Sequence, residues 1–356
     1  MADSPSPQCV TRIRNEVIFL AVLAKRDLFP GIKTQLEVVF SQPTLNAFAA
    51  LPKSIHDEVR EAIKEIYTEH PDEVKWLVAN GTESAHNVQM HVLISISSFT
   101  RAEASQTGLP TLPNAYADSA SSVVVSGTPI ERPVGQFLDD CTAVGSDVIC
   151  EASGVLNYEF QVAAIIGKLV GAGQIPRTAN ADGHIFGLVL LNNWIVNSLL
   201  LVPMLIKFLT SARDPLNPSN NKHFHTSMSP WVISTSAAFL ADTSSINYAI
   251  SLRIEVIRNG SSTTTCFTSF GTMARTLYQM IASRASCGKV PGTGDDEHGF
   301  LAETKLGGKA VEMADGSELL WLRDGDIVKI TGTVGGEKYG VGFGECVGEI
   351  KATKIL

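Results

Sequence analysis

Residues 184–209, HIFGLVLLNNWIVNSLLLVPMLIKFL, form the most apolar stretch of the chain, and it is long enough to cross a bilayer. Its middle contains Asn192, Asn193, Asn197 and Pro203. Because an amide without a hydrogen-bond partner is costly in hydrocarbon, these residues argue against a membrane span. We therefore predict a buried strand that is followed by a buried helix over 192–209, both in the core of a water-soluble protein.

Length and charge narrow the class of protein further. The chain has 356 residues, of which 44% are hydrophobic and 18% charged, as in globular proteins with one large domain or two ordinary ones. The net charge of −8 and the lack of a basic stripe argue against nucleic acid as a partner. The six cysteines are scattered without CxxC pairs, and the N-terminus has no signal-peptide pattern, so we predict a cytoplasmic location.

The pattern of apolar residues changes along the chain. Residues 35–69 contain apolar side chains at spacings of three and four, which predicts an amphipathic helix. From residue 120 onward short β-branched runs alternate with glycine and proline, which predicts a mostly β domain with a further helix over 268–284. We therefore expect two domains, 1–90 and 91–356.

Several segments resemble the fumarylacetoacetase family, and they occur in the family's order from about residue 35 onward. The resemblance implies a mostly β (α+β) fold with a rolled antiparallel sheet, a small N-terminal domain that is shortened here, and a homodimer. The matching segments are VFSQPTLNAF (39–48), ASSVVVSGTPIERPVGQ (120–136), HIFGLVLLNNW (184–194), MSPWV (228–232) and LRDGDIVKITG with YGVGFGECVG (322–348).

The resemblance also implies a site, in which carboxylates hold Mg²⁺ or Ca²⁺ and a His–Glu pair activates water to cleave a carbon–carbon bond of a 1,3-dicarbonyl acid. At the matching ligand positions this chain keeps Glu159 but has Gln161, Asn193 and Arg101 instead of acids. Residues 92–183 contain no histidine that could be the base. Since hard cations are selected by carboxylate charge, we predict no metal cofactor, and we expect the buried Glu159 to pair with Arg101.

Other groups of the family's site are retained or replaced. Lys222 matches the lysine that stabilises an oxyanion, and Glu303 matches the glutamate that orients the catalytic histidine, so both are candidate catalytic residues. Tyr116 matches a substrate-binding tyrosine. Lys289 replaces a small hydroxyl residue near the substrate carboxylate, and Asn197 replaces an arginine, so these three are candidate substrate-binding residues.

Two functions remain open at this point. The first is a divergent enzyme that acts without metal on a small enolic or 1,3-dicarbonyl acid by proton transfer, cyclisation, isomerisation or C–C cleavage. The alternative is a non-catalytic assembly subunit, because the apolar segment 195–209 would suit burial against a partner beyond a homodimer. We favour the enzyme, since Lys222 and Glu303 have no evident structural need.

Overall fold

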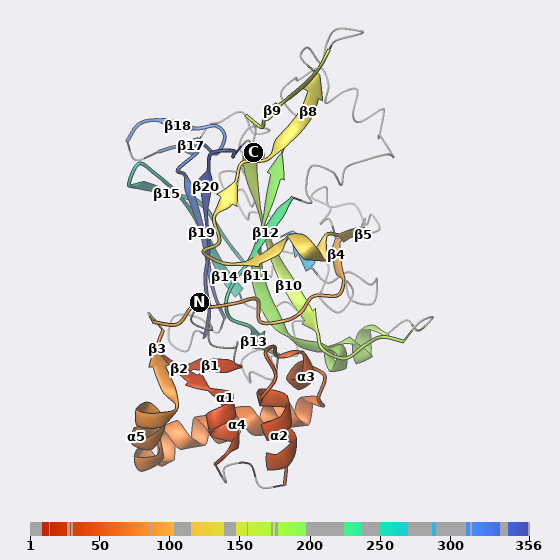
Figure 1. Cartoon of the computed structure of the whole chain (residues 1–356), viewed down its shortest axis with the longest axis vertical. Coiled ribbons are helices and arrows are strands. Elements are labelled where there is room, and N and C mark those ends of the chain that lie inside the picture. Colours follow the sequence, from red (N-terminus) through yellow and green to blue (C-terminus); the bar gives the residue numbers. More distant parts are fainter. Residues whose placement is uncertain are drawn as a thin grey trace, which may run out of the picture.

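The computed structural model consists mostly of strands with few helices, which confirms the predicted mostly β fold (Figure 1). It describes residues 9–354 with gaps. The residues outside the description are 1–8, 14, 27–28, 30, 86, 103–114, 139–146, 155, 172–173, 175–176, 197–223, 236–249, 270–286, 290–310, 314, 335–340 and 355–356. At some strand positions, among them 101–102, 115–116 and 287–289, only the backbone is described.

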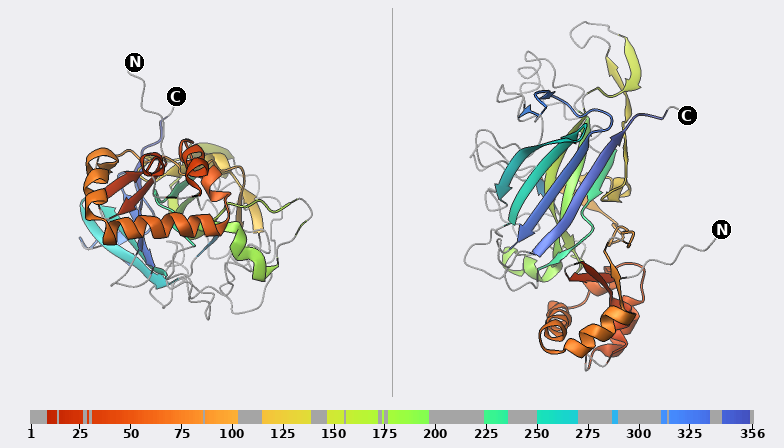
Figure 2. Two further views of the ribbon diagram at one scale, coloured as in Figure 1. Left: turned by 90° about the horizontal axis from the view of Figure 1, so that it is seen from below. Right: turned by 90° about the vertical axis from the view of Figure 1, so that its left-hand side faces the viewer.

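The N-terminal helices gather at one end of the molecule beside a small sheet (Figures 1 and 2). The strands of this sheet pair antiparallel in the order β1-β2-β3: β1 (Val10–Ile13), β2 (Glu16–Phe19) and β3 (Thr82–Ser84). The helices between β2 and β3 are α1 (Leu20–Ala24), α2 (Lys33–Phe40), α3 (Asn46–Ala49), α4 (Lys53–Glu69) and α5 (Pro71–Asn80).

The single amphipathic helix predicted over 35–69 is divided in the structure into α2, α3 and α4, and the predicted apolar spacing belongs mainly to α4. Val59 and Ile66 are buried in the N-terminal core, and Ile55 and Ile63 pack against the same core. The helix ends at His70, whose φ of −121° and ψ of 70° are not helical. The cause is the proline that follows, because a residue before proline avoids the helical region.

Two larger sheets make up most of the remaining described strands. The first is an eight-stranded sheet in the order β5-β4-β16-β10-β11-β12-β6, with β13 paired to β11. Its strands are β4 (Phe99–Ala102), β5 (Ala115–Asp118), β6 (Val123–Val125), β10 (Leu156–Ile166), β11 (Ile185–Val196), β12 (His225–Met228), β13 (Ile233–Ser234) and β16 (Cys287–Lys289). The long central pair β10 and β11 is antiparallel, whereas β16 with β4 and β12 with β6 are parallel. The sheet is therefore mixed, which the prediction of an antiparallel sheet did not include.

The second sheet has the order β15-β14-β19-β20-β7. Its strands are β7 (Ile130–Glu131), β14 (Ile250–Arg258), β15 (Ser261–Ser269), β19 (Ile327–Val334) and β20 (Val341–Lys351). Asn259 and Gly260 both have positive φ, 51° and 78°, and form the tight turn between β14 and β15 that Asn-Gly predicts. The remaining elements are the ribbons β8 (Val134–Leu138) with β9 (Val148–Ala152) and β17 (Val311–Glu312) with β18 (Glu318–Leu319), and the 3₁₀ turns η1 (Ala120–Ser122) and η2 (Thr178–His184).

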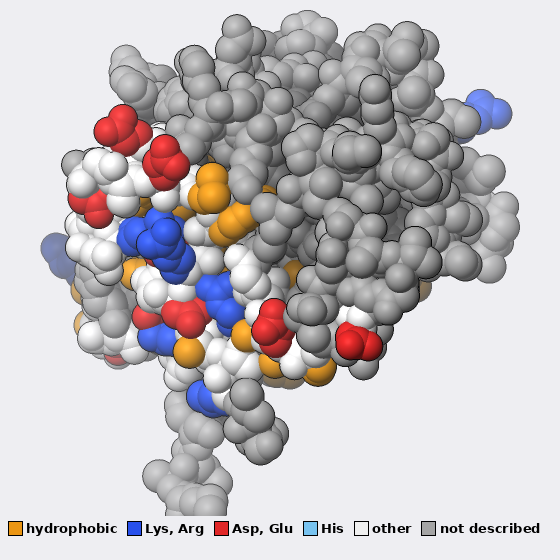
Figure 3. Space-filling view, turned by 90° about the horizontal axis from the view of Figure 1, so that it is seen from above, with side chains coloured by type: hydrophobic (Ala, Val, Ile, Leu, Met, Phe, Trp, Pro, Cys, Tyr) orange, Lys and Arg blue, Asp and Glu red, His pale blue; other side chains and the backbone are white. Residues whose placement is uncertain are grey.

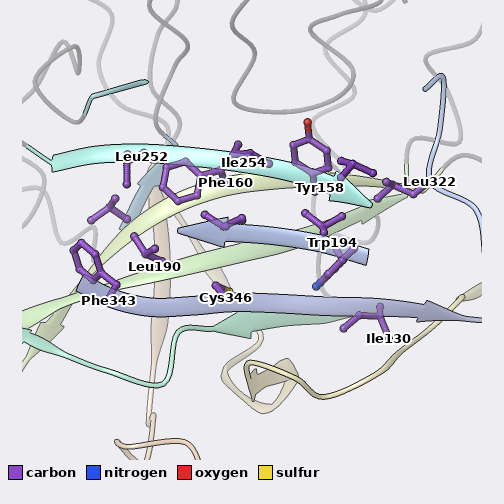
Figure 4. Close-up of a cluster of buried hydrophobic side chains, with 14 of the residues drawn as sticks. Ile130, Tyr158, Phe160, Leu190, Trp194, Leu252, Ile254, Leu322, Phe343 and Cys346 are labelled. Atoms are coloured by element: carbon purple, nitrogen blue, oxygen red, sulfur yellow. The ribbon is translucent and has the colours of Figure 1, made fainter. Parts of the chain in front are cut away.

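The main hydrophobic core lies between the two large sheets (Figure 4). Tyr158, Phe160 and Trp194 of the first sheet meet residues such as Ile254 and Phe343 of the second, and all five are fully buried. Because side chains alternate along a strand, Tyr158, Phe160 and Trp194 occupy one face of β10 and β11. The residues between them, which include Glu159 and Asn193, occupy the other face.

The N-terminal core continues into the first residues of β11. The ring of Phe186 contacts the rings of Phe48 and His56 at centroid distances of 5.8 Å and 5.0 Å. An ion pair of 2.6 Å joins Lys53 of α4 to Asp182 of η2. These contacts fix the N-terminal helices to one end of the eight-stranded sheet.

The apolar stretch that could have been a membrane span begins as a strand of this sheet. Residues 185–196 form β11, which is buried along its whole length, as predicted. Residues 192–196 continue the strand, so the helix predicted over 192–209 does not begin there, and its other residues lie outside the description. The same holds for the helix predicted over 268–284, because 268–269 belong to β15 and the rest is not described. In the described part of the chain, no helix is long and apolar enough to cross a membrane.

Candidate functional site

A buried polar patch lies on the face of β10 and β11 that points away from the main core. Glu159 and Gln161 are two residues apart on β10, and Asn193 of β11 is directly opposite Glu159. Their exposed fractions are 5%, 2% and 0%. Burial of polar groups is costly unless they are paired, so the patch needs internal partners or a ligand.

One contact within the patch orients an amide. Nδ2 of Asn193 donates a hydrogen bond to Oε2 of Glu159 at 3.5 Å. Oδ1 of the same amide is buried and has no hydrogen-bond partner within the described structure. A buried oxygen in this state is a candidate ligand atom, because nothing else in the described residues compensates its desolvation.

Strand pairing brings three other predicted residues into the same sheet. Lys289 of β16 is the cross-strand neighbour of Gln161. Arg101 of β4 pairs with Cys287, two residues from Lys289, and Tyr116 of β5 pairs with Arg101. By register, positions 116, 101 and 289 therefore share a sheet face with the polar patch.

The same face becomes apolar away from the patch. Ala163, Val189, Leu191 and Met228 form a buried cluster with Phe99 of β4. Leu191 lies directly opposite Gln161, so the apolar cluster begins next to the polar patch. This arrangement would keep water away from one side of a bound molecule.

Not every predicted site residue can be placed. Lys222, Glu303 and Asn197 lie outside the described residues, and so do the side chains of Arg101, Tyr116 and Lys289. Their roles, and the pairing of Glu159 with Arg101, stay predictions. The register places Arg101 two strands away from Glu159.

The sequence analysis did not identify the strand that pairs with β11 beside Asn193. Thr226 of β12 is its cross-strand neighbour and is fully buried. On the opposite face, Nε1 of Trp194 donates to Oγ of Ser227 at 3.0 Å. Residues 225–228 read His-Thr-Ser-Met, three polar residues and then one apolar residue, so no alternating pattern identified this strand.

His225 belongs to the opposite side of the sheet. It is the cross-strand neighbour of Trp194, which faces the main core. Burial lowers the pKa of His225 to about 4, so its imidazole is neutral near pH 7. The position of His225 therefore does not supply the base that residues 92–183 lack.

The described part of the surface carries charged side chains of both signs. On the described part of the face in Figure 3, Lys and Arg side chains are interspersed with Asp and Glu. Basic and acidic side chains also form ion pairs, among them Arg132 with Asp324 at 2.7 Å and Lys354 with Glu131 at 2.8 Å. The prediction that nucleic acid is not a partner stays a prediction.

Comparison with known families matches nearly the whole chain. The family described as fumarylacetoacetase N-terminal matches residues 1–100, and the family described as fumarylacetoacetate (FAA) hydrolase C-terminal matches residues 75–352. The two matches overlap, so they do not fix a boundary, and the predicted division at residue 90 stays a prediction.

Individual proteins agree with these matches. The chain is 31% identical to fumarylacetoacetase fahA of Aspergillus fumigatus, over 98% of this chain and 92% of that protein. It is 32% identical to a fumarylacetoacetase of Emericella nidulans, over 90% of this chain and 85% of that one. Among solved structures, maleylpyruvate hydrolase from Sphingobium sp. SYK-6, in complex with manganese(II) ion and pyruvate, is similar with a TM-score of 0.54 at 11% identity. That similarity covers 98% of each chain.

The prediction that this chain has no metal cofactor is contradicted by the match to the fumarylacetoacetate (FAA) hydrolase family, which uses a divalent metal, and the similar maleylpyruvate hydrolase contains manganese(II). The physical reason for the error is that the prediction counted charges and not ligand atoms. Carboxylate and amide carbonyl oxygens are both hard donors that Mg²⁺, Ca²⁺ and Mn²⁺ accept. Glu159, the unpartnered Oδ1 of Asn193 and the amide of Gln161 fit such an ion. In the described residues no three His, Cys, Asp or Glu side chains group to hold a metal, so the oxygens that these residues offer to an ion include amide oxygens.

Proposed function

This chain belongs to the fumarylacetoacetase family, and we propose that it is an enzyme that cleaves a carbon–carbon bond of a small enolic or 1,3-dicarbonyl acid with the help of a divalent cation. The observation that supports the proposal most is the buried oxygen patch of Glu159, Gln161 and Asn193 beside an apolar sheet face. A membrane, nucleic acid or protein partner would not require polar oxygens at this depth. A small charged ligand would.

The patch is the part of the chain that would hold the cation. Glu159 supplies the negative charge, and the amides of Gln161 and Asn193 supply neutral oxygens. A bound divalent cation would polarise a carbonyl oxygen of the substrate and stabilise the enolate that forms when the carbon–carbon bond breaks. The proposal extends to this chain the kind of ion that the manganese complex of maleylpyruvate hydrolase contains.

The remaining predicted residues bind and orient the substrate in this proposal. Lys222 stabilises the oxyanion with its positive charge, and Glu303 accepts a proton from the attacking water. Lys289 binds the substrate carboxylate, whereas Tyr116 and Asn197 donate hydrogen bonds to its oxygens. Support for Lys289 and Tyr116 comes from their register positions in the same sheet as Glu159.

The apolar residues of the sheet face have a role in the same proposal. Leu191, Val189 and Met228 are buried beside the patch. An apolar surface that excludes water strengthens the attraction between the charged groups and the developing enolate, because the local dielectric constant is low. It also limits the site to substrates with an apolar portion of modest size.

Assembly and location are further parts of the proposal. We expect a cytoplasmic homodimer, and a larger assembly through residues 195–209 remains the alternative. Light scattering on the purified chain measures the mass directly. A monomer at micromolar concentration would exclude both forms.

The test of the proposed function is turnover with added Mn²⁺ or Mg²⁺ on fumarylacetoacetate, maleylpyruvate and related acylpyruvates. The loss of the enol absorbance measures the rate. We expect Lys222→Met and Glu303→Gln each to lower kcat/KM by about 10²-fold or more. Lys354→Met is the matched control, because its exposed pair with Glu131 contributes little.

Two results would contradict the proposal. One is full activity in both variants, which would exclude Lys222 and Glu303 from the reaction. The other is the absence of turnover on every dicarbonyl acid in the presence of either ion, which would favour the non-catalytic alternative.

A further inference from the structure

The Glu159–Asn193 pair has a property that two ionised carboxylates could not have. The two residues are cross-strand neighbours, and both are nine-tenths or more buried. Two buried carboxylates at this spacing would repel each other when no cation separates them. An amide opposite a carboxylate instead donates a hydrogen bond to it, and Nδ2 of Asn193 does so at 3.5 Å.

The hydrogen bond also determines which atom of Asn193 is left for a ligand. With Nδ2 turned toward Glu159, Oδ1 is the free acceptor of the amide, and it is buried without a partner in the described structure. The amide is therefore oriented before any ion arrives. The ion would gain one oriented oxygen from Asn193, but no second negative charge.

We propose that Asn193 is a neutral oxygen ligand that makes the empty site stable at the expense of ion affinity, so that the cation exchanges readily and is not needed for folding. This inference rests on the proposed function, because it concerns the cation of the same site. Its physical basis is that affinity for hard cations depends on the number of charged ligands, and that stability of the empty site depends on their mutual repulsion.

The test compares Asn193→Asp with the original chain. In EDTA we expect Asn193→Asp to lower Tm by several degrees, because two buried carboxylates then face each other. A Mn²⁺ titration by calorimetry should show a dissociation constant lower by about tenfold or more. Mn²⁺ should accordingly raise Tm more in the variant than in the original chain, since stabilisation by a ligand increases with its affinity.

The adjacent residue provides a matched control. Asn192 is also fully buried, but strand alternation places it on the face toward the main core. Asn192→Asp adds the same charge one residue away. We expect it to lower Tm in EDTA as well, with no tighter binding of Mn²⁺ and no additional recovery of Tm.

A second variant separates charge from shape. Glu159→Gln combined with Asn193→Asp exchanges the acid and the amide and keeps a single negative charge between the two positions. We expect its Tm in EDTA to be closer to that of the original chain than the Tm of Asn193→Asp. If Asn193→Asp folds only when Mn²⁺ is present, that result supports the inference, and the exchanged pair then provides the metal-free comparison.

Each contrary result has a defined meaning. Equal or weaker Mn²⁺ binding by Asn193→Asp, while the original chain binds the ion, would overturn this inference and leave the proposed function intact. An exchanged pair as unstable as Asn193→Asp would also overturn it. If neither the original chain nor Asn193→Asp binds Mn²⁺, the inference and the metal-assisted function both fail.

Discussion

The two faces of β10 and β11 are equally buried but differ in chemistry. The face toward the second sheet is filled by large side chains such as Phe160 and Trp194, whose rings pack in the main core. The other face has Glu159 and Asn193 at similar burial. Burial on the first face stabilises the fold directly, whereas burial on the second has a cost that only a ligand or mutual pairing reduces. The comparison therefore separates the residues that maintain the fold from those that we assign to function.

The largest expected effect on stability comes from the core face. Phe160→Ala removes a fully buried ring from the main core between the two large sheets and should lower the free energy of unfolding by about 3–5 kcal/mol. Urea denaturation followed by tryptophan fluorescence measures this loss. A change below about 1 kcal/mol would show that the two faces are not energetically distinct.

Glu159→Gln tests the residue next to Phe160 on the opposite face. It removes the charge of the oxygen patch while keeping its shape, so we expect kcat/KM to fall by about 10²-fold through loss of ion binding. The free energy of unfolding in EDTA should change by less than about 1 kcal/mol, as expected for a near-isosteric change. A loss of stability as large as that of Phe160→Ala, measured by the same denaturation, would show that Glu159 maintains the fold.

Gly348→Ala tests how closely the core face is packed. A Cβ at this glycine would lie 2.4 Å from Cζ2 of Trp194, so the indole or β20 has to move. We expect a loss of about 1–3 kcal/mol from overpacking. Because Asn193 is next to Trp194 in sequence, Mn²⁺ affinity should also fall slightly. Gly316→Ala is unsuitable as a control, since its φ of 78° adds strain of its own.

The smallest effect concerns the pH dependence of His225. Its folded pKa of about 4 lies below the ordinary value of 6.5, so the unfolded chain takes up the proton first as the pH falls. The contribution of neutral His225 is fully present above pH 6.5, and about 1 kcal/mol of it should be lost between pH 6.5 and 5.5. Denaturation of His225→Gln across this range should lack that slope. An unchanged slope would show that His225 is not desolvated on the core face.

Local sequence patterns predicted much of the fold. The apolar spacing of α4, the Asn259–Gly260 turn and the strand at 185–196 all depend on nearby residues and agree with the structure. The parallel pairs of β4 with β16 and of β6 with β12 were not predicted, because they join segments that are far apart in the chain. No local pattern specifies such a register.

The site was predictable in part. The family resemblance identified Glu159, Gln161 and Asn193, which the structure brings together in one patch. It led to a wrong conclusion about the metal, because a count of acids ignores the orientation of an amide. The free Oδ1 of Asn193 depends on a hydrogen bond across two strands, and this is information that only three-dimensional structure contains.

Strand β11 belongs to two cores, and this has a consequence for how the protein unfolds. Phe186 at its beginning is part of the N-terminal core, whereas Leu188 and Leu190 are part of the main core. Because β11 contributes residues to both cores, we expect the two cores to unfold as one cooperative unit. Slow hydrogen exchange in α4 and in β11 should therefore be lost together as denaturant is added. A substitution that destabilises the N-terminal helices should therefore also destabilise β11, the strand that carries Asn193.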